Sequence, residues 1–282
     1  MANYCDLHTH STFSDGTLTP RQLLQAACDA GLSAVALTDH NTVAGLPDFL
    51  AAAPDFPIAA ICGIEFSVDY LGTELHLLAL FLQPEHFSTI SAMMADFQRR
   101  KEESNRLLVE NLSKAGFRLD YEAIKAASGG YVNRAHIAAA MTEHGYTGSI
   151  KEAFQNYLSP KHGYYVPPRR ADVFETIAFI KSIGAVAVLA HPFLNLDENA
   201  LTEFLPQAAK CGLDGMEVLY PTFDAEQTAA AQALACQFGL LPSGGSDFHG
   251  DNKPHIQLGC GQGDLAVPER CWLDLRQAAA KH

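Results

Sequence analysis

The chain has 282 residues, enough for one large α/β barrel-type domain or for two ordinary domains. Nearly half of the residues are apolar, which is ample for a hydrophobic core, and no low-complexity tract indicates disorder. A formal net charge of −13, without any run of Lys and Arg, argues against binding extended duplex nucleic acid through a broad basic surface.

The first predicted element is a short strand over residues 4–8, and it carries two histidines at its end. His8 and His10 project from the same face, because alternate residues of a strand point the same way. Asp15 follows on the next loop. Two imidazoles and a carboxylate in this arrangement suggest the start of a metal site.

A helix followed by a buried strand is the pattern that recurs along the chain. The segment "TPRQLLQAACDAGLSAVALTDH" begins with Thr19 as a helix cap and ends in a strand that stops at Asp39 and His40. Such alternation predicts parallel βαβ units, whose strand ends lie at the edge where barrel enzymes build active sites. The alternative is that the polar residues only terminate strands. Three further segments end at His191, at Glu217 or Tyr220, and at Asp247 and His249.

The middle of the chain has a different, helical character. Residues 87–117 predict a long amphipathic helix, and shorter helical stretches follow up to the Pro-rich return "SPKHGYYVPPRR". We therefore expect a barrel made of residues 1–99 and 166–282, with residues 100–165 as a helical insertion that covers the substrate. In the last third, Pro206 is expected to kink or restart its helix.

The candidate metal ligands contain imidazoles and carboxylates but no thiolate. Such a set suits Mn, Fe or Zn, whereas Mg and Ca prefer oxygen ligands alone. Nine ligands exceed what one tetrahedral ion needs, so at least two divalent ions are expected, and three if Glu65 bridges. The nine are His8, His10, Asp15, His40, Glu65, His76, His191, Asp247 and His249.

The motifs "DLHTHSTFSDG", "LTDHN", "GIEFS", "ELHLLALF", "AHPF" and "GGSDFHG" resemble, in this order, those of the polymerase and histidinol phosphatase (PHP) family. The resemblance implies a distorted (β/α)7 TIM-like barrel with two or three metals that hydrolyse phosphate esters. It also implies three ligand sets: His8, His10, Glu65 and Asp247; Asp15, His40 and His249; and Glu65, His76 and His191.

Some branches of this family have histidine where this chain has Asp15. With aspartate there, the chain resembles the branch acting on 3′,5′-bisphosphonucleotides and RNA 5′ ends, and "NRAHIAAAM" and "SPKHGYYVP" strengthen that match. The resemblance assigns catalysis to Asp15, His40, Asp247 and His249, and substrate binding to Arg134, His136 and Lys161.

The expected function is hydrolysis of small nucleotide monoesters, in particular removal of the 3′-phosphate from 3′,5′-bisphosphonucleotides, with 5′–3′ trimming of short RNA as a further activity. Cyclic phosphodiesters and histidinol phosphate are alternatives, as are an amidohydrolase and a non-catalytic metal-binding module. Seven scattered cysteines without a CxxC pair, no signal peptide and no apolar run long enough to span a membrane lead us to expect a cytoplasmic protein without an obligate protein partner.

Overall fold

The structure is a computed structural model that describes residues 4–128 and 132–281. The chain divides into two compact units, one formed by Met1–Ser91 with Arg170–His282 and the other by Ala92–Arg169. The helical insertion expected at residues 100–165 falls within the second unit, which begins eight residues earlier and ends four residues later than that expectation.

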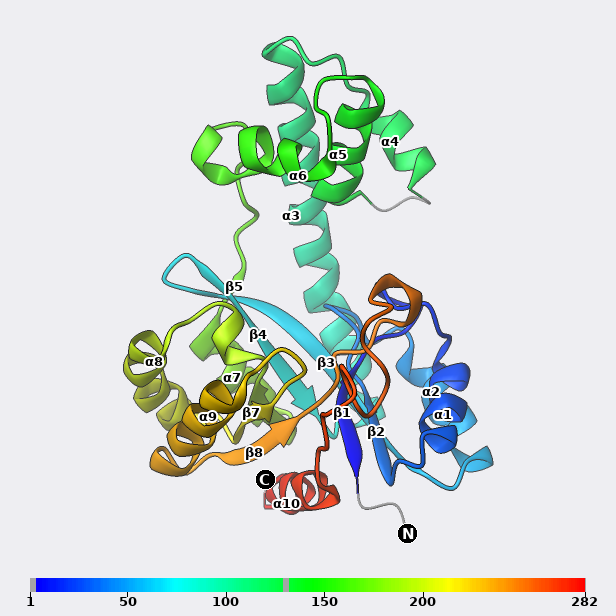
Figure 1. Ribbon diagram of the computed structural model, residues 1–282, viewed down its shortest axis with the longest axis vertical. Helices are drawn as coiled ribbons and strands as arrows, with labels where there is room; N and C mark the ends of the chain where they lie inside the picture. The colour runs from blue at the N-terminus through cyan, green and yellow to red at the C-terminus, as the bar shows by residue number, and fades with distance from the viewer. Residues whose placement is uncertain (1–3, 129–131, 282) are drawn as a thin grey trace. The chain divides into compact units, whose positions relative to one another are not determined.

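The first unit is built on one twisted sheet that nearly closes into a barrel (Figure 1). Its strands follow the order β1-β2-β3-β4-β6-β7-β8, with the short β5 beside β3. A parallel bridge between Thr9 and Phe248 connects the first strand to the chain that follows the last one. The expected distorted TIM-like barrel is confirmed, with seven of the eight strands in the barrel order and β5 outside it. The strands are β1 (Cys5–Thr9), β2 (Ala34–Leu37), β3 (Ala59–Tyr70), β4 (Thr73–Leu80), β5 (Ala171–Asp172), β6 (Val186–Leu189), β7 (Gly215–Leu219) and β8 (Leu241–Gly244).

One strand departs from the parallel pattern. Strand β4 is antiparallel to both of its neighbours, β3 and β6. The reason is local, because only two residues, Leu71 and Gly72, connect β3 to β4, and both have a positive φ, of 52° and 87°. A two-residue connection of this kind makes a hairpin, whereas a parallel pair needs a crossover of a dozen or more residues.

Helices cover the outside of the barrel, with α1 and α2 beside β1–β3 and α7 to α9 beside β6–β8 (Figure 1). The N-cap of α1 is Thr19, as predicted, and it forms a capping box with Gln22. Pro206 does not restart a helix, since α8 continues on both sides of it and Pro206 lies on the exposed face. The helices are α1 (Pro20–Asp29), α2 (Leu46–Ala52), α7 (Val173–Ser182), α8 (Glu198–Cys211), α9 (Ala225–Gln237) and α10 (Glu269–Ala279).

The barrel interior is filled by small and branched side chains, and α10 packs across its lower end. Trp272 and Leu275 of α10 join Leu7, Leu78 and Val188 from the strands in one buried cluster. The amino-terminal ends of the strands are therefore closed by apolar packing, which leaves the carboxyl ends for polar chemistry.

The second unit is helical and has its own core, which includes Leu108, Ile124, Ile137 and Met141. Across residues 4–128 and 132–281, no helix combines the length and apolar character needed to cross a bilayer. The helices are α3 (Phe87–Lys114), which begins in the barrel unit, α4 (Tyr121–Ala127), α5 (Arg134–Glu143) and α6 (Ile150–Ala153), followed by the short turns Phe154–Leu158 and Pro160–His162.

Candidate metal centre

The nine predicted ligands all belong to the barrel unit and come from or directly after its strands. His8 lies in β1, and His10 directly follows that strand. The loops after β2, β6 and β8 carry four more of the predicted ligands. Backbone pairing between His40 and Glu65, and between Thr9 and Phe248, brings these strand ends together. The ligands are His8, His10, Asp15, His40, Glu65, His76, His191, Asp247 and His249.

Glu65 is the centre of the cluster. Its Oε2 lies 3.2 Å from His8 Nε2 and 3.3 Å from His10 Nε2. The same oxygen lies 2.8 Å from His40 Nδ1. Its Oε1 lies 2.7 Å from His76 Nδ1 and 3.0 Å from the Nε2 of His191, the fifth imidazole. One fully buried carboxylate therefore has imidazoles on both of its oxygens, so either oxygen could help to hold an ion.

Asp15 and Asp247 are the other two carboxylates of the cluster, and both lie close to imidazoles. Asp15 Oδ1 lies 3.2 Å from His249 Nε2, 3.8 Å from His40 Nε2 and 3.9 Å from His10 Nδ1. Asp247 Oδ1 lies 3.1 Å from His10 Nε2. Ligand atoms fall within 4.8 Å of one another in four groups: His10, Asp15, His40 and His249; His8, Glu65 and His191; His8, His10 and Asp247; and His40, Glu65 and His76.

These groups overlap with the three sets that the resemblance implies but do not coincide with them. His10 joins Asp15, His40 and His249, whereas His76 and His191 fall into separate groups that share Glu65.

Several buried nitrogen and oxygen atoms of this cluster have no hydrogen-bond partner. Across residues 4–128 and 132–281, this holds for His8 Nε2, both ring nitrogens of His10, Glu65 Oε2 and His191 Nδ1. A buried polar atom without a partner costs about 1–3 kcal/mol, so a group of them needs an explanation. Divalent ions supply one, because imidazole nitrogens and carboxylate oxygens are their ordinary ligands. The residues present therefore fit a metal site.

Burial and the charges of neighbouring side chains shift the pKa values of the cluster in opposite directions. Burial and the neighbouring His40 lower the pKa of His10 to about 3, so its imidazole keeps a free lone pair at neutral pH. Burial raises the pKa of the Glu65 carboxyl, but His40, His8 and His76 outweigh it and hold that pKa well below its usual range. Burial lowers the pKa of His76, and the Glu65 carboxylate overcomes this and raises it to about 10.

The backbone is strained where ligands leave the strands. His191 and Asp247 have positive φ angles of 28° and 53°, and Asn41, next to a ligand, has 51°. Such conformations cost about 1–3 kcal/mol each and persist where the surroundings hold them in place. Gly245 is needed nearby, since a Cβ there would lie 2.4 Å from the Cβ of His8. The "GGSDFHG" loop therefore packs closely against β1.

Glu217 is a site residue that the list of expected ligands lacks. It is fully buried and is the middle residue of β7. Its Oε1 accepts a hydrogen bond from His8 Nδ1–H at 3.1 Å, and its Oε2 accepts one from the backbone N–H of His191 at 2.6 Å. Because Nδ1 of His8 carries the proton, Nε2 is left to face the cluster. The sequence carried a signal, a lone acid in an otherwise apolar strand, and Glu217 was one of the two residues at which this segment was expected to end.

Asp39, which follows β2, is buried and accepts three hydrogen bonds. Its carboxylate accepts hydrogen bonds from the Ser11 backbone N–H at 2.7 Å, the Ser11 hydroxyl at 2.6 Å and the Ser14 hydroxyl at 2.6 Å. It therefore fixes the loop between the β1 histidines and Asp15.

A cavity of about 380 Å³ opens onto the cluster. Two of its lining residues contact Asp247: Tyr220, expected as one of two possible ends of its segment, and Lys253, which the sequence did not single out. The Tyr220 hydroxyl donates to Asp247 Oδ2 at 2.8 Å, and Lys253 Nζ lies 2.6 Å from the same oxygen. The lining is formed by His40, Glu74, His76, His191, Leu194, Asn195, Tyr220, Asp247 and Lys253.

The three expected substrate-binding residues lie in the helical unit and belong to none of the ligand groups. The Arg134 guanidinium lies over the rings of Tyr165, at 4.5 Å, and Phe154, at 5.6 Å. His136 completes a capping box with Asn133 at the start of α5. Lys161 is exposed on the turn Pro160–His162.

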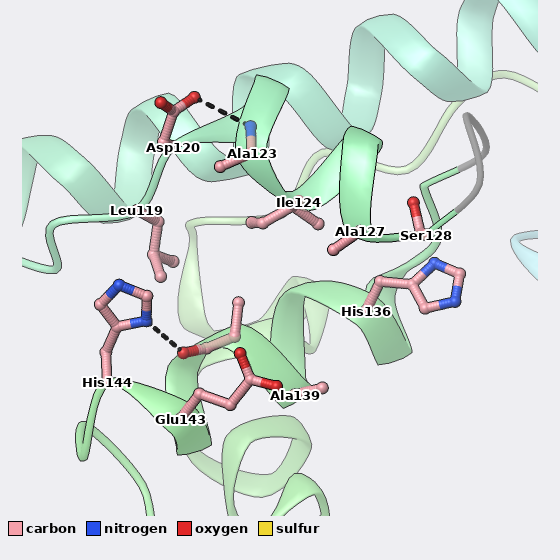
Figure 2. A pocket seen from close by; sticks show the side chains of 11 residues that line it. Leu119, Asp120, Ala123, Ile124, Ala127, Ser128, His136, Ala139, Glu143 and His144 are labelled. Carbon is pink, nitrogen blue, oxygen red and sulfur yellow. Dashed lines mark hydrogen bonds between the residues drawn. The ribbon is translucent and has the colours of Figure 1, made fainter.

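His136 also lines a pocket of about 310 Å³ between α4 and α5. Figure 2 shows His136 and Glu143 of α5, with His144 directly after the helix, and alanine and isoleucine side chains of α4 opposite them.

A buried cluster of imidazoles and carboxylates at the carboxyl ends of barrel strands defines a metal-dependent hydrolase. A family model described as the PHP domain matches residues 6–167, more than half of the chain. The chain belongs to the PHP family, as the sequence motifs predicted.

Characterised relatives cover nearly the whole chain. A 5′-3′ exoribonuclease of Haemophilus influenzae is 32% identical over 88% of this chain and 91% of its own length. A phosphoribosyl 1,2-cyclic phosphate 1,2-diphosphodiesterase of Eggerthella lenta is 31% identical, over 89% and 97%. A 3′,5′-nucleoside bisphosphate phosphatase of Chromobacterium violaceum is 28% identical, over 92% and 91%. A crystal structure of a proposed metal-dependent phosphoesterase from Bifidobacterium adolescentis matches with a TM-score of 0.77 and 30% identity, over 99% of this chain and 97% of that one.

Proposed function

We propose that this chain hydrolyses phosphate monoesters of small nucleotides with two to three Mn, Fe or Zn ions in the cluster. Its preferred reaction is removal of the 3′-phosphate from 3′,5′-bisphosphonucleotides. The observation that carries the proposal is Glu65, a buried carboxylate with five imidazoles around its two oxygens. The relatives named above, which act on phosphate esters of nucleotides, RNA or a ribosyl group, support the same class of reaction.

Divalent ions held by these residues supply Lewis acidity, which lowers the pKa of water from 15.7 towards about 7 at a single catalytic zinc. The chain's own residues prepare the site for this chemistry. Glu217 fixes the tautomer of His8, and Tyr220 orients the carboxylate of Asp247 through its hydroxyl proton. The reaction needs no covalent protein nucleophile, because water can attack phosphorus directly.

The residues assigned to catalysis are Asp15, His40, Asp247 and His249. Asp15 has a side chain that is 57% exposed, while its Oδ1 lies 3.2 Å from His249 Nε2. It is the most open of the three carboxylates in the cluster, which favours a place where water and substrate enter. His249 is in turn oriented by its Nδ1–H, which donates to the backbone carbonyl of Asp247 at 2.7 Å.

We assign substrate selection to the helical unit, with Arg134, His136 and Lys161 as its binding residues and the barrel unit as the reaction centre. Every ligand of the cluster belongs to the barrel unit, so selectivity requires contacts to a second, non-reacting part of the substrate. A guanidinium suits a second phosphate, since it can donate two parallel hydrogen bonds.

A second candidate is 5′–3′ trimming of short RNA, favoured by the identity to the exoribonuclease of Haemophilus influenzae. Hydrolysis of a cyclic phosphodiester is favoured by the relative from Eggerthella lenta. For either activity we place the protein in the cytoplasm, a reducing compartment that suits seven cysteines which are all free thiols.

The test is phosphate release across a panel of mono-, bis- and cyclic nucleotides and a 5′-phosphorylated RNA, with Mn present. We expect the largest kcat/KM for a 3′,5′-bisphosphonucleotide. A larger kcat/KM for the RNA or for the cyclic nucleotide would show that this alternative, and not the bisphosphonucleotide, is the preferred substrate. Failure to hydrolyse any ester, with ions bound, would overturn the phosphoesterase proposal.

A further inference from the structure

Lys253 is a cation at the metal cavity to which no role has been given above. Its ammonium lies 2.6 Å from Asp247 Oδ2, and its side chain is 37% exposed. Among the described residues that line this cavity, Lys253 is the one Lys or Arg. Its position is therefore not that of an ordinary solvated surface lysine.

The two oxygens of Asp247 have different surroundings. Oδ1 faces imidazoles, at 3.1 Å from His10 Nε2 and 3.6 Å from His8 Nε2. Oδ2 instead accepts the hydroxyl proton of Tyr220 and lies against the ammonium of Lys253. Oδ1 is thus the oxygen available to an ion, and the ammonium lies on the opposite oxygen of the same carboxylate.

The backbone that carries Lys253 is attached to the loop that carries Asp15. Asn252 donates from Nδ2 to the carbonyl of Asp15 at 2.8 Å, and the backbone N–H of Asp251 donates to Thr17 Oγ1 at 3.0 Å. Gly250, with φ of 64°, allows this approach, since a Cβ there would lie 2.0 Å from Thr17 Oγ1. The position of the lysine is therefore set by the same loops that carry metal ligands.

We propose that Lys253 binds a non-bridging oxygen of the substrate phosphoryl group and thereby makes the site favour phosphate monoesters over diesters. The inference rests on the proposed phosphoesterase function. An ammonium has three N–H donors, and the contact with Asp247 uses one of them. The remaining donors are available to an oxygen that enters the cavity, which is open enough to leave over a third of the side chain exposed.

The charge of the substrate explains the selectivity. A phosphate monoester carries about −1.5 to −2 charges at pH 7, because its second pKa is about 6, whereas a diester carries one. In hydrolysis the water oxygen forms a bond to phosphorus while the ester P–O bond breaks, and the leaving oxygen takes a proton. Lys253 keeps its own protons and stabilises charge on the equatorial oxygens, which is greater for the monoester.

The experiment compares p-nitrophenyl phosphate with bis(p-nitrophenyl) phosphate, which share a leaving group and differ by one charge. Lys253→Met removes the ammonium from a side chain of similar length. We expect kcat/KM for the monoester to fall about 100-fold, as for loss of one donor to developing negative charge, and for the diester less than about tenfold. Lys253→Arg should restore most of the monoester activity. Lys210→Met, on the exposed face of α8, is the matched control.

Two readouts separate phosphate binding from a purely positioning role on Asp247. Elemental analysis should find unchanged metal content in Lys253→Met, and calorimetry should show weaker binding of inorganic phosphate to the Mn-loaded protein. Tyr220→Phe removes the other partner of Asp247 Oδ2 and should lower both activities equally, with loss of metal.

A Lys253→Met protein that behaved like Tyr220→Phe, or that lost no activity on either ester, would overturn the inference. If the parent protein hydrolysed neither ester, the proposed function would fall, and phosphate binding would still decide the role of Lys253. Weaker binding in Lys253→Met would support it, and equal binding would refute it.

Discussion

Glu217 holds His8 in the one orientation that turns its Nε2 towards Glu65. The Nδ1–H of His8 donates to Glu217 Oε1 at 3.1 Å, and Nε2 lies 3.2 Å from Glu65 Oε2. Both carboxylates and the imidazole are fully buried, so water does not compete for these contacts. A carboxylate behind an imidazole fixes its tautomer and increases its basicity as a ligand.

Replacement of this carboxylate should weaken metal binding without removing a ligand. In Glu217→Gln, the amide cannot accept from both His8 and the backbone of His191, and the negative charge is lost. We expect metal affinity to fall about 10- to 100-fold, measured by competition with a chelating dye. Glu203→Gln, on the exposed face of α8, is the control. Equal affinities in the two variants would show that Glu217 does not support the site.

The protein purified without chelator should carry two to three transition-metal ions per chain. The reason is that four ligand groups overlap, two of them through Glu65, and together they exceed the needs of a single ion. Elemental analysis measures the number directly, and one ion or fewer after reconstitution would contradict the prediction. Because the ions bind the folded state, adding Mn to the chelated protein should raise the free energy of unfolding by about 4 kcal/mol at 1,000 times Kd. The melting temperature should rise accordingly. Mg should stabilise less, since it prefers oxygen ligands.

Asp247→Asn should cost far more activity than stability. The change removes the charge facing His10 and His8 while keeping the shape of the side chain. We expect kcat to fall more than about 100-fold, with circular dichroism and thermal unfolding of the metal-free protein nearly unchanged. The exposed Asp251→Asn, four residues away, serves as the control. Turnover within about tenfold of the parent, a difference of roughly 1.4 kcal/mol, would show that the assignment is wrong.

Arg134→Ala should separate substrate selection from the reaction. If Arg134 binds a second phosphate, hydrolysis of bisphosphorylated nucleotides should fall strongly, while hydrolysis of p-nitrophenyl phosphate and metal content stay nearly unchanged. Arg134 also packs on Tyr165 and Phe154, so thermal unfolding must be measured in parallel. The exposed Arg118→Ala is the control in the same unit. Equal losses on both substrates would place Arg134 in the fold or the reaction, and no loss would leave it an ordinary structural residue.

The cysteines should divide by reactivity. Burial raises the pKa of Cys62 to about 12, and burial with the charge of Asp274 raises that of Cys271 to about 11. Since the thiolate is the reactive form, both should stay unmodified by a thiol reagent at pH 8, whereas the exposed Cys236 reacts quickly. Mass spectrometry of the labelled protein checks this, with urea-unfolded protein as the control. Fast labelling of Cys62 in the folded protein would contradict it.

The sequence by itself determined the barrel and its chemistry. Apolar periodicity predicted strands that end at His8, His40, His191 and Asp247, and those strand ends do converge. This was predictable because a parallel arrangement of βαβ units places all carboxyl ends at one edge, whatever the details of packing. The long helix expected over residues 87–117 is also confirmed, as α3 (Phe87–Lys114). The motif set went further and identified the family, because its residues follow one another in a fixed order.

The tertiary structure decided three features: the direction of β4, which ligand groups share a residue, and which residues support the ligands by contact. Periodicity is the same for parallel and antiparallel strands, so it could not predict the inversion that the turn at Leu71 imposes. Glu217 and Lys253 each acquire a role only from the side chain that they face, which is 209 residues away in one case and six in the other. Such contacts depend on which strands become neighbours and how their loops pack, and this is fixed only when the barrel closes.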